Sequence, residues 1–174
     1  TVGGGVKTIK DINLLLKSGA DKVAINTAAF HDRSFIKEAV KTFGSQCIII
    51  SVDYKNVDGV EIIFTNSGKK NTKKNLYDYL KEINELNVGE ILLTSIDRDG
   101  TMQGYDTKVI EKANNILKTP IIASGGAKDY EDMLNLINKT KINALAAASI
   151  YHFKNQTPKL AKNFLKEKGM KVRE

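Results

Sequence analysis

The sequence of 174 residues contains no tryptophan, one cysteine and two prolines. The single cysteine, Cys47, excludes an internal disulfide and any multi-cysteine metal site, and such cysteine usage is typical of a reducing compartment. We therefore expect a cytoplasmic protein. We also expect no metal and no cofactor. With 41% hydrophobic and 27% charged residues, the composition excludes a collagen-like or largely disordered chain and favours one globular domain over residues 1–174.

Long apolar runs are absent as well. The longest are the length of a β-strand, far short of the ~18 residues that cross a membrane, so we expect no membrane partner. Lys and Arg (27) exceed Asp and Glu (20), which gives a formal charge of +7. These cations are spread along the chain and rarely alternate with aromatic residues, as a nucleic-acid groove would require. The positive charge instead suits anionic small molecules.

The chain does contain short, β-branched apolar runs that alternate with segments of helical periodicity. This alternation predicts repeated βα units around a parallel sheet. The chain begins with Thr1-Val2-Gly3-Gly4-Gly5 and has no initiator Met. We therefore expect a part of a longer protein that begins inside a strand. The predicted strands are the end of one at Thr1-Val2, and then Lys22–Asn26, Cys47–Asp53, Glu90–Ser95, Pro120–Ser124 and Asn143–Ala147.

An internal repeat helps to choose between a (βα)8 barrel and an open, doubly wound sheet. A glycine-rich strand end, a helix and a strand that ends in small residues occur in residues 2–30 and again in residues 124–150. The two copies lie four βα units apart, which places them on opposite sides of the mouth of an eight-stranded barrel. The repeat therefore favours the barrel.

Glycine pairs open both copies of the repeat, at Gly4-Gly5 and Gly125-Gly126. Such turns leave backbone N–H groups uncovered beside a helix N-terminus, where a phosphate can bind, although many glycine turns are only structural. Small or polar residues end the next strand in each copy, at Asn26-Thr27 and Ala148-Ser149. Two equivalent sites across one mouth predict a substrate with a phosphate at each end.

Strand alternation places Asp53 on the inner face of the sheet with Ser51, at the carboxyl end of an apolar strand. A carboxylate there is a candidate acid or base, and a helix cap or a loop ion pair is the alternative. Lys22 and Glu90 would face inward at the opposite ends of their strands. A charged floor of this kind either closes the barrel structurally or forms an opening for a small polar molecule, and the residues alone leave both open.

His31, His152 and Cys47 show no catalytic or metal-ligand spacing. Longer segments nevertheless resemble a known family, the cyclase subunit of imidazole glycerol phosphate synthase in histidine biosynthesis. The resemblance runs the length of the chain, and residues 94–106 carry its most specific part. The matching segments are Gly3-Gly4-Gly5, residues 20–28, residues 43–47, residues 89–101, Gly104-Tyr105-Asp106 and residues 122–127.

The resemblance implies a (βα)8 barrel of which this chain covers the end of the third strand to the eighth helix. It also implies a reaction in which ammonia from a partner glutaminase, docked at the amino ends of the strands, converts a phosphoribulosyl formimino aminoimidazole carboxamide ribotide. The products are imidazole glycerol phosphate and an aminoimidazole carboxamide ribotide. Two aspartates perform the acid–base chemistry in this family, and only Asp53 has a counterpart here. We therefore expect this chain alone to be inactive.

Residue by residue, the resemblance implies active-site positions at Asn26, Asp53, Ser67, Thr94 and Asp99, phosphate contacts at Gly5, Thr27, Gly126 and Ser149, and an ammonia gate at Lys22 and Glu90. Alternatives remain at this stage: the phosphoribosyl isomerase of the same pathway, an ammonia-delivering subunit of surface-sugar biosynthesis and, in another class, a barrel that only binds phosphate.

Overall fold

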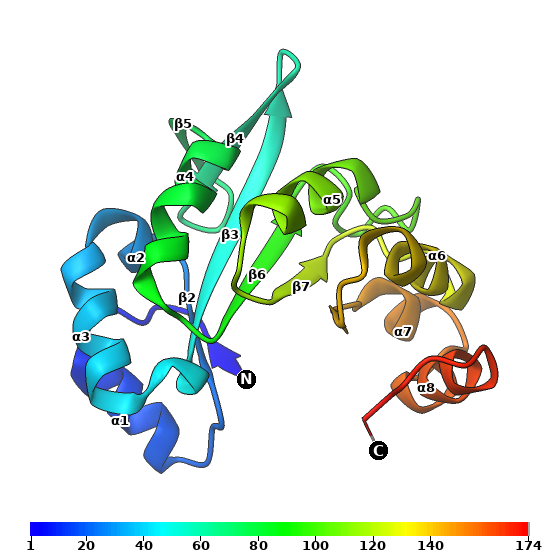
Figure 1. Cartoon of the computed structure of the whole chain (residues 1–174), viewed down its shortest axis with the longest axis horizontal. Coiled ribbons are helices and arrows are strands. Elements are labelled where there is room, and N and C mark those ends of the chain that lie inside the picture. Colours follow the sequence, from blue (N-terminus) through cyan, green and yellow to red (C-terminus); the bar gives the residue numbers. More distant parts are fainter. Residues whose placement is uncertain (174) are drawn as a thin grey trace.

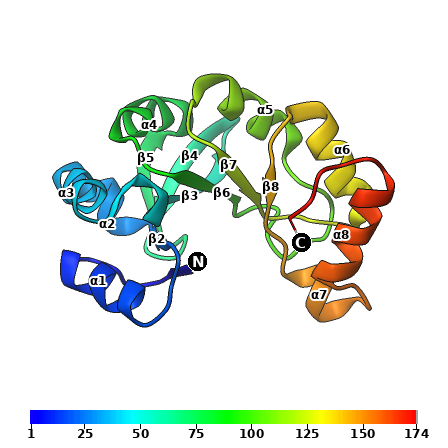
Figure 2. The same cartoon turned by 60° about the horizontal axis from the view of Figure 1, so that its bottom comes forward.

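A computed structural model describes residues 1–173. Six parallel strands form a curved sheet in the order β1-β2-β3-β6-β7-β8, and the helices lie along its convex side (Figures 1 and 2). The strands are β1 (Val2–Gly3), β2 (Val23–Ile25), β3 (Ile48–Val57), β6 (Glu90–Ser95), β7 (Ile121–Ser124) and β8 (Ala144–Leu145). Because the order follows the chain without reversal, the sheet is part of a (βα)8 barrel and not a doubly wound sheet. The predicted fold class is thus confirmed.

The helices begin at residues that stabilise their first turns. Thr8 and Asp11 form a capping box at the start of α1, and Thr157 with Pro158 starts α8. None of the helices within residues 1–173 is long and apolar enough to cross a membrane. The helices are α1 (Ile9–Lys17), α2 (Thr27–His31), α3 (Arg33–Phe43), α4 (Leu76–Ile83), α5 (Thr107–Ile116), α6 (Tyr130–Thr140), α7 (Ser149–Phe153) and α8 (Pro158–Glu167), with 3-10 turns at Ser45–Cys47 and Asn84–Leu86.

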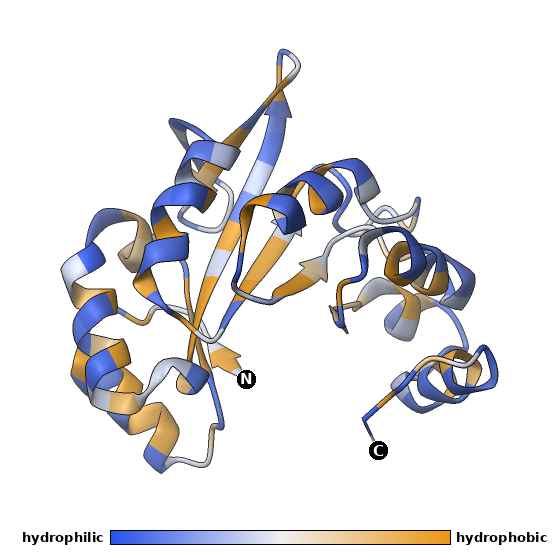
Figure 3. Ribbon diagram, viewed as in Figure 1, coloured by the Kyte–Doolittle hydropathy of each residue, from blue (hydrophilic) through white to orange (hydrophobic). Residues whose placement is uncertain are grey.

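The core lies between the sheet and its helices. Ile48, Ile50 and Val52 of β3 are almost fully buried on the helix side, whereas Ser51 and Asp53 point to the concave side. Hydrophobic residues follow β3, β6 and β7 and the helix sides that face them (Figure 3). This alternation is the pattern that strand parity predicts, and it leaves polar side chains free to project into the concavity.

The structure departs from the predicted elements after β3. Instead of a direct passage to a helix, an antiparallel hairpin of β4 (Val60–Thr65) and β5 (Lys70–Asn75) extends the sheet beside β3 (Figure 1). Its first turn is Asp58-Gly59, where both residues have positive φ angles of 51° and 83°. An Asp-Gly pair favours such hairpin turns, so this pair was the signal that could have revealed the hairpin.

The predicted strand limits also need correction. Cys47 ends a 3-10 turn rather than starting a strand, and β3 continues beyond Asp53 to Val57, where it pairs with the hairpin. The strand expected at Asn143–Ala147 is reduced to Ala144–Leu145. Alanine has low β-propensity, which explains why the alanine-rich segment forms only a short strand. Two short helices, α2 and α7, follow β2 and β8 and begin at Thr27 and Ser149. They were not predicted, because five residues are too few to show helical periodicity.

Candidate active site at the carboxyl ends of the strands

Two pockets lie at the mouth formed by the carboxyl ends of the strands. The first has a volume of about 930 Å³ and the second of about 120 Å³, and Ala146 lines both. Each pocket is lined by the glycine pair of one copy of the sequence repeat and by the small or polar residues that follow its second strand. The predicted site residues of the first pocket are Gly4, Gly5, Asn26, Thr27, Asp53 and Ser67, and those of the second are Asp99, Gly125, Gly126, Ala148 and Ser149.

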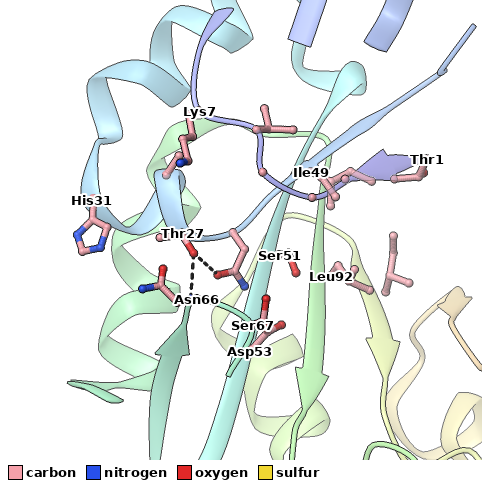
Figure 4. A pocket seen from close by; sticks show the side chains of 18 of the residues that line it. Thr1, Lys7, Thr27, His31, Ile49, Ser51, Asp53, Asn66, Ser67 and Leu92 are labelled. Atoms are coloured by element: carbon pink, nitrogen blue, oxygen red, sulfur yellow. Dashed lines mark hydrogen bonds between the residues drawn. The ribbon is translucent and has the colours of Figure 1, made fainter. Parts of the chain in front are cut away.

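The hairpin forms part of the wall of the first pocket. The Thr27 hydroxyl accepts a hydrogen bond from the Asn66 backbone N–H at 3.0 Å and donates one to Asn26 Oδ1 at 3.4 Å (Figure 4). Asn66 and Ser67 have φ angles of 54° and 57°, so the turn between β4 and β5 is sharply bent there. Figure 4 shows Ser51, Ser67 and Asp53 gathered at one end of the pocket. The turn thus brings Ser67 close to Asp53 of β3.

Asp53 projects from the inner face of β3 into the first pocket, and in the sheet it is paired with Thr94 of β6. Burial raises the pKa of its carboxyl above the ordinary value, and the negative charge of Asp99 adds to this effect. Hydrogen bonds with the Asn26 and Ser51 side chains oppose it by favouring the ionised form. Asp53 is therefore a carboxyl that keeps a proton to higher pH than an exposed aspartate, as a general acid requires.

The second pocket depends on a close approach between two loops. Gly126 has a φ angle of 96°, and a Cβ atom there would overlap the carbonyl oxygen of Gly104. The Gly104 N–H in turn donates a hydrogen bond of 2.7 Å to the Gly126 carbonyl. Only glycine fits this position, which explains why the second glycine pair is needed for structure as well as for exposing backbone N–H groups.

Lys22 and Glu90 lie at the opposite, amino ends of the strands. Lys22 Nζ and Glu90 Oε2 form an ion pair of 2.6 Å, and their side chains are 34% and 21% exposed. They share the strand faces of Ala24 and Leu92, which line the first pocket. Both side chains thus lie on the inner face, as strand parity predicts, and their opposite charges form an ion pair.

Some of the site was not visible in the sequence. Lys7 and His31 line the first pocket, although His31 was interpreted as a residue of a helix-capping region. Lys7 follows Gly5 by two residues, and this proximity was the one available signal. Thr94 lies beside Asp53 on the neighbouring strand but is not among the residues that line either pocket. The remaining predicted site residues gather in the two pockets or in the ion pair.

Comparison with known proteins identifies the family. The family described as "Histidine biosynthesis protein" matches residues 1–157. Proteins named imidazole glycerol phosphate synthase subunit HisF, from Natranaerobius thermophilus and Saccharolobus solfataricus, are 45% and 44% identical to this chain. The HisF subunit of Sulfurisphaera tokodaii is 46% identical. Each alignment covers 99% of this chain and 69% of the relative. The chain belongs to the HisF family.

Membership of the HisF family confirms the resemblance to the cyclase subunit of imidazole glycerol phosphate synthase. It also favours the histidine-pathway cyclase over the alternatives that the motifs left open, because these relatives are named as subunits of imidazole glycerol phosphate synthase.

Proposed function

We propose that this chain, as part of the full-length cyclase subunit of imidazole glycerol phosphate synthase, supplies Asp53 and both phosphate pockets for a lyase reaction that incorporates ammonia. Phosphoribulosyl formimino aminoimidazole carboxamide ribotide would be converted to imidazole glycerol phosphate and aminoimidazole carboxamide ribotide. One observation carries the proposal. Two glycine-lined pockets share one mouth, and Asp53, a carboxyl whose pKa burial raises, stands in the wall of the larger pocket.

Each pocket would bind one phosphate of the substrate. Backbone N–H groups at Gly4 and Gly5 and the Ser67 hydroxyl suit a phosphate in the first pocket, and the Thr27 hydroxyl would turn its proton from Asn26 to the phosphate. The second pocket offers equivalent N–H groups and a further hydroxyl, at Gly125, Gly126, Ala148 and Ser149. Lys7 contributes a positive charge to the wall of the first pocket, and the net charge of +7 attracts a doubly phosphorylated substrate.

Asp53 would act as the general acid in ring closure. The Asn26 and Ser51 side chains lower the pKa of its carboxyl, whereas burial and the charge of Asp99 raise it and favour the protonated form. Thr94, on the adjacent strand, would contact the reacting part of the substrate, as the family resemblance implies. Proton transfer by a positioned carboxyl contributes roughly 10²–10⁴-fold in rate.

Ammonia would come from a glutaminase subunit that forms a heterodimer with this chain. The partner would dock at the amino ends of the strands, where Lys22 and Glu90 lie. The ion pair would then act as a gate, because a molecule that enters from this side must pass the two side chains before it reaches Leu92 and the first pocket.

The proposal is tested by Asp53→Asn in the full-length protein, since the resemblance assigns a second aspartate that residues 1–174 do not contain. Asparagine keeps the size and hydrogen bonding of the side chain but cannot deliver the proton. We expect ammonia-dependent turnover to fall by about 10²–10⁴-fold while the affinity for the bisphosphate substrate changes little. Asp58→Asn, in the exposed hairpin turn, is the matched control and should be fully active. Near-normal turnover in Asp53→Asn eliminates the role.

A further inference from the structure

A carboxylate that lines neither pocket joins the two loops around the second one. Asp132 lies in the first turn of α6, and its Oδ2 accepts hydrogen bonds from the backbone N–H groups of Tyr105, at 3.3 Å, and Lys128, at 3.2 Å. Tyr105 belongs to the loop of residues 96–106 after β6, and Lys128 to the loop of residues 125–129 after β7. One side chain therefore accepts a hydrogen bond from each loop.

The packing around Gly104 shows how closely the carboxylate fits. Gly104 is buried in the loop of residues 96–106, with a φ angle of 103°. A Cβ atom on this residue would lie 3.1 Å from Asp132 Oδ1. The same loop supplies residues 99, 100 and 102 to the wall of the second pocket, opposite Gly125 and Gly126. Asp132 thus contacts the loop directly behind the pocket wall.

Tyr105 extends this arrangement to a third segment. Its side chain is buried, and its hydroxyl donates a hydrogen bond of 3.0 Å to the carbonyl oxygen of Ala146, which lines both pockets. Asp132 fixes the backbone of Tyr105, and Tyr105 in turn holds the segment after β8. Three of the segments that surround the second pocket are therefore connected through these two residues.

We propose that Asp132 is a positioning residue for the second pocket: by accepting one hydrogen bond from each loop, it fixes the separation at which their backbone groups bind a phosphate. This inference rests on the proposed function, which assigns a phosphate to the pocket. Charge attraction is not the reason for an acidic residue here, because a carboxylate repels an anion. Burial raises the pKa of Asp132 while the two N–H groups lower it, as expected of a side chain used as an acceptor.

The test is a titration of the full-length protein with inorganic phosphate, followed by amide NMR shifts at both pockets. Signals of Gly126 and Ser149 report the second pocket, and those of Gly5 and Thr27 report the first, which serves as an internal control. In Asp132→Ala both N–H groups lose their acceptor. We expect phosphate affinity to fall about tenfold at the second pocket and to stay unchanged at the first. Asp132→Asn retains an acceptor oxygen and should restore the affinity.

Three results would overturn the inference. Equal affinities in Asp132→Ala and in the original protein, with phosphate bound at both pockets, contradict it and leave the proposed function intact. So does Asp132→Asn behaving like Asp132→Ala, because the charge rather than the acceptor would then matter. Absence of binding at the second pocket of the original protein contradicts both proposals. If Asp132→Ala fails to fold, Asp132→Ser, whose shorter side chain cannot accept from both N–H groups, tests the same contacts and should weaken phosphate binding at the second pocket alone.

A second control separates positioning from stability. Asp129 caps α6 by accepting the Asp132 N–H at 2.8 Å, and its carboxylate makes no hydrogen bond to the loop of residues 96–106. Asp129→Ala should lower the melting temperature as an ordinary loss of a helix cap does. Phosphate affinity at the second pocket should remain close to that of the original protein. An equal loss of affinity in Asp129→Ala would reduce the role of Asp132 to helix stability.

Discussion

The Asp53 carboxyl has opposite consequences for stability and for chemistry. Burial raises its pKa, which means that the folded protein binds its proton more tightly than the unfolded chain does. Asp53 therefore contributes stability that is fully present below the ordinary value of 3.8 and is lost as the pH rises through the raised pKa. At neutral pH the ionised form opposes folding. A buried acid placed for proton transfer therefore lowers the stability of the fold at neutral pH.

The pH dependence of the contribution of Asp53 to stability gives a prediction. Asp53→Asn removes a partly buried charge, so its melting temperature at pH 7 should exceed that of the original protein although its activity is lost. The difference should shrink as the pH is lowered through the raised pKa and disappear below 3.8. Thermal unfolding at several pH values measures it, with Asp58→Asn as the exposed control. A lower melting temperature for Asp53→Asn at pH 7 would contradict the proposed state of the carboxyl.

At the scale of elements, the β4–β5 hairpin completes a pocket that the parallel strands only begin. It adds Asn66 and Ser67 to the wall, and the Asn66 N–H donates to the Thr27 hydroxyl at the start of α2. Gly68, in the same turn, lies close to Ile96 at the end of β6. The hairpin is therefore fixed between α2 and β6, and Thr27 links its position to the first pocket.

Thr27→Val tests this link, because valine has the same shape but no hydroxyl. The Asn66 N–H then loses its acceptor, and because this bond is exposed to water its loss costs about 0.5–1.5 kcal/mol. We expect the Michaelis constant for the bisphosphate substrate to rise roughly five- to tenfold and the Asn66 amide to exchange its hydrogen faster. Thr27→Ser keeps the hydroxyl and should show neither effect. Unchanged exchange at Asn66 in Thr27→Val would refute the link.

A structural feature can be predicted from the sequence where residues close together in the chain determine it. Glu90–Ser95 is predicted to the residue because a short run of consecutive apolar residues defines it, and the capping box at Thr8 depends on neighbouring residues alone. The β5 strand escapes prediction because Lys70–Asn75 is polar throughout and pairs only at an edge. In the site, the repeat brings the two glycine pairs to one mouth. Asp132 acts through contacts across space, which no spacing in the sequence encodes.

In the molecule as a whole, the two pockets that we propose bind the substrate and the ion pair that we propose as the entry point lie at opposite ends of the sheet. The two pockets occupy the carboxyl ends of the strands, and the Lys22–Glu90 ion pair lies at the amino ends. Barrel enzymes in general place chemistry at the carboxyl ends. Paired charges at the amino ends are thus free to serve a different purpose, such as admission of a small molecule from a partner subunit.

Lys22→Ala separates a gate from a structural ion pair. In complex with the glutaminase, glutamine-dependent activity should fall by at least fivefold, while activity with added ammonium salts, which reach the mouth directly, should stay within twofold. Because the pair is partly exposed, its contribution to stability is expected to be below about 1 kcal/mol. Lys10→Ala, on the exposed side of α1, is the control. Equal loss of both activities with a large fall in melting temperature would show a structural role.

The central claim is that one substrate spans two anion pockets at the same mouth. It is tested most directly by a crystal structure of the full-length protein soaked in inorganic phosphate. The account predicts one phosphate beside Gly5 and Thr27 and another beside Gly126 and Ser149, each held by backbone N–H groups and a hydroxyl. Phosphate at neither position, or at the first alone, would contradict the account.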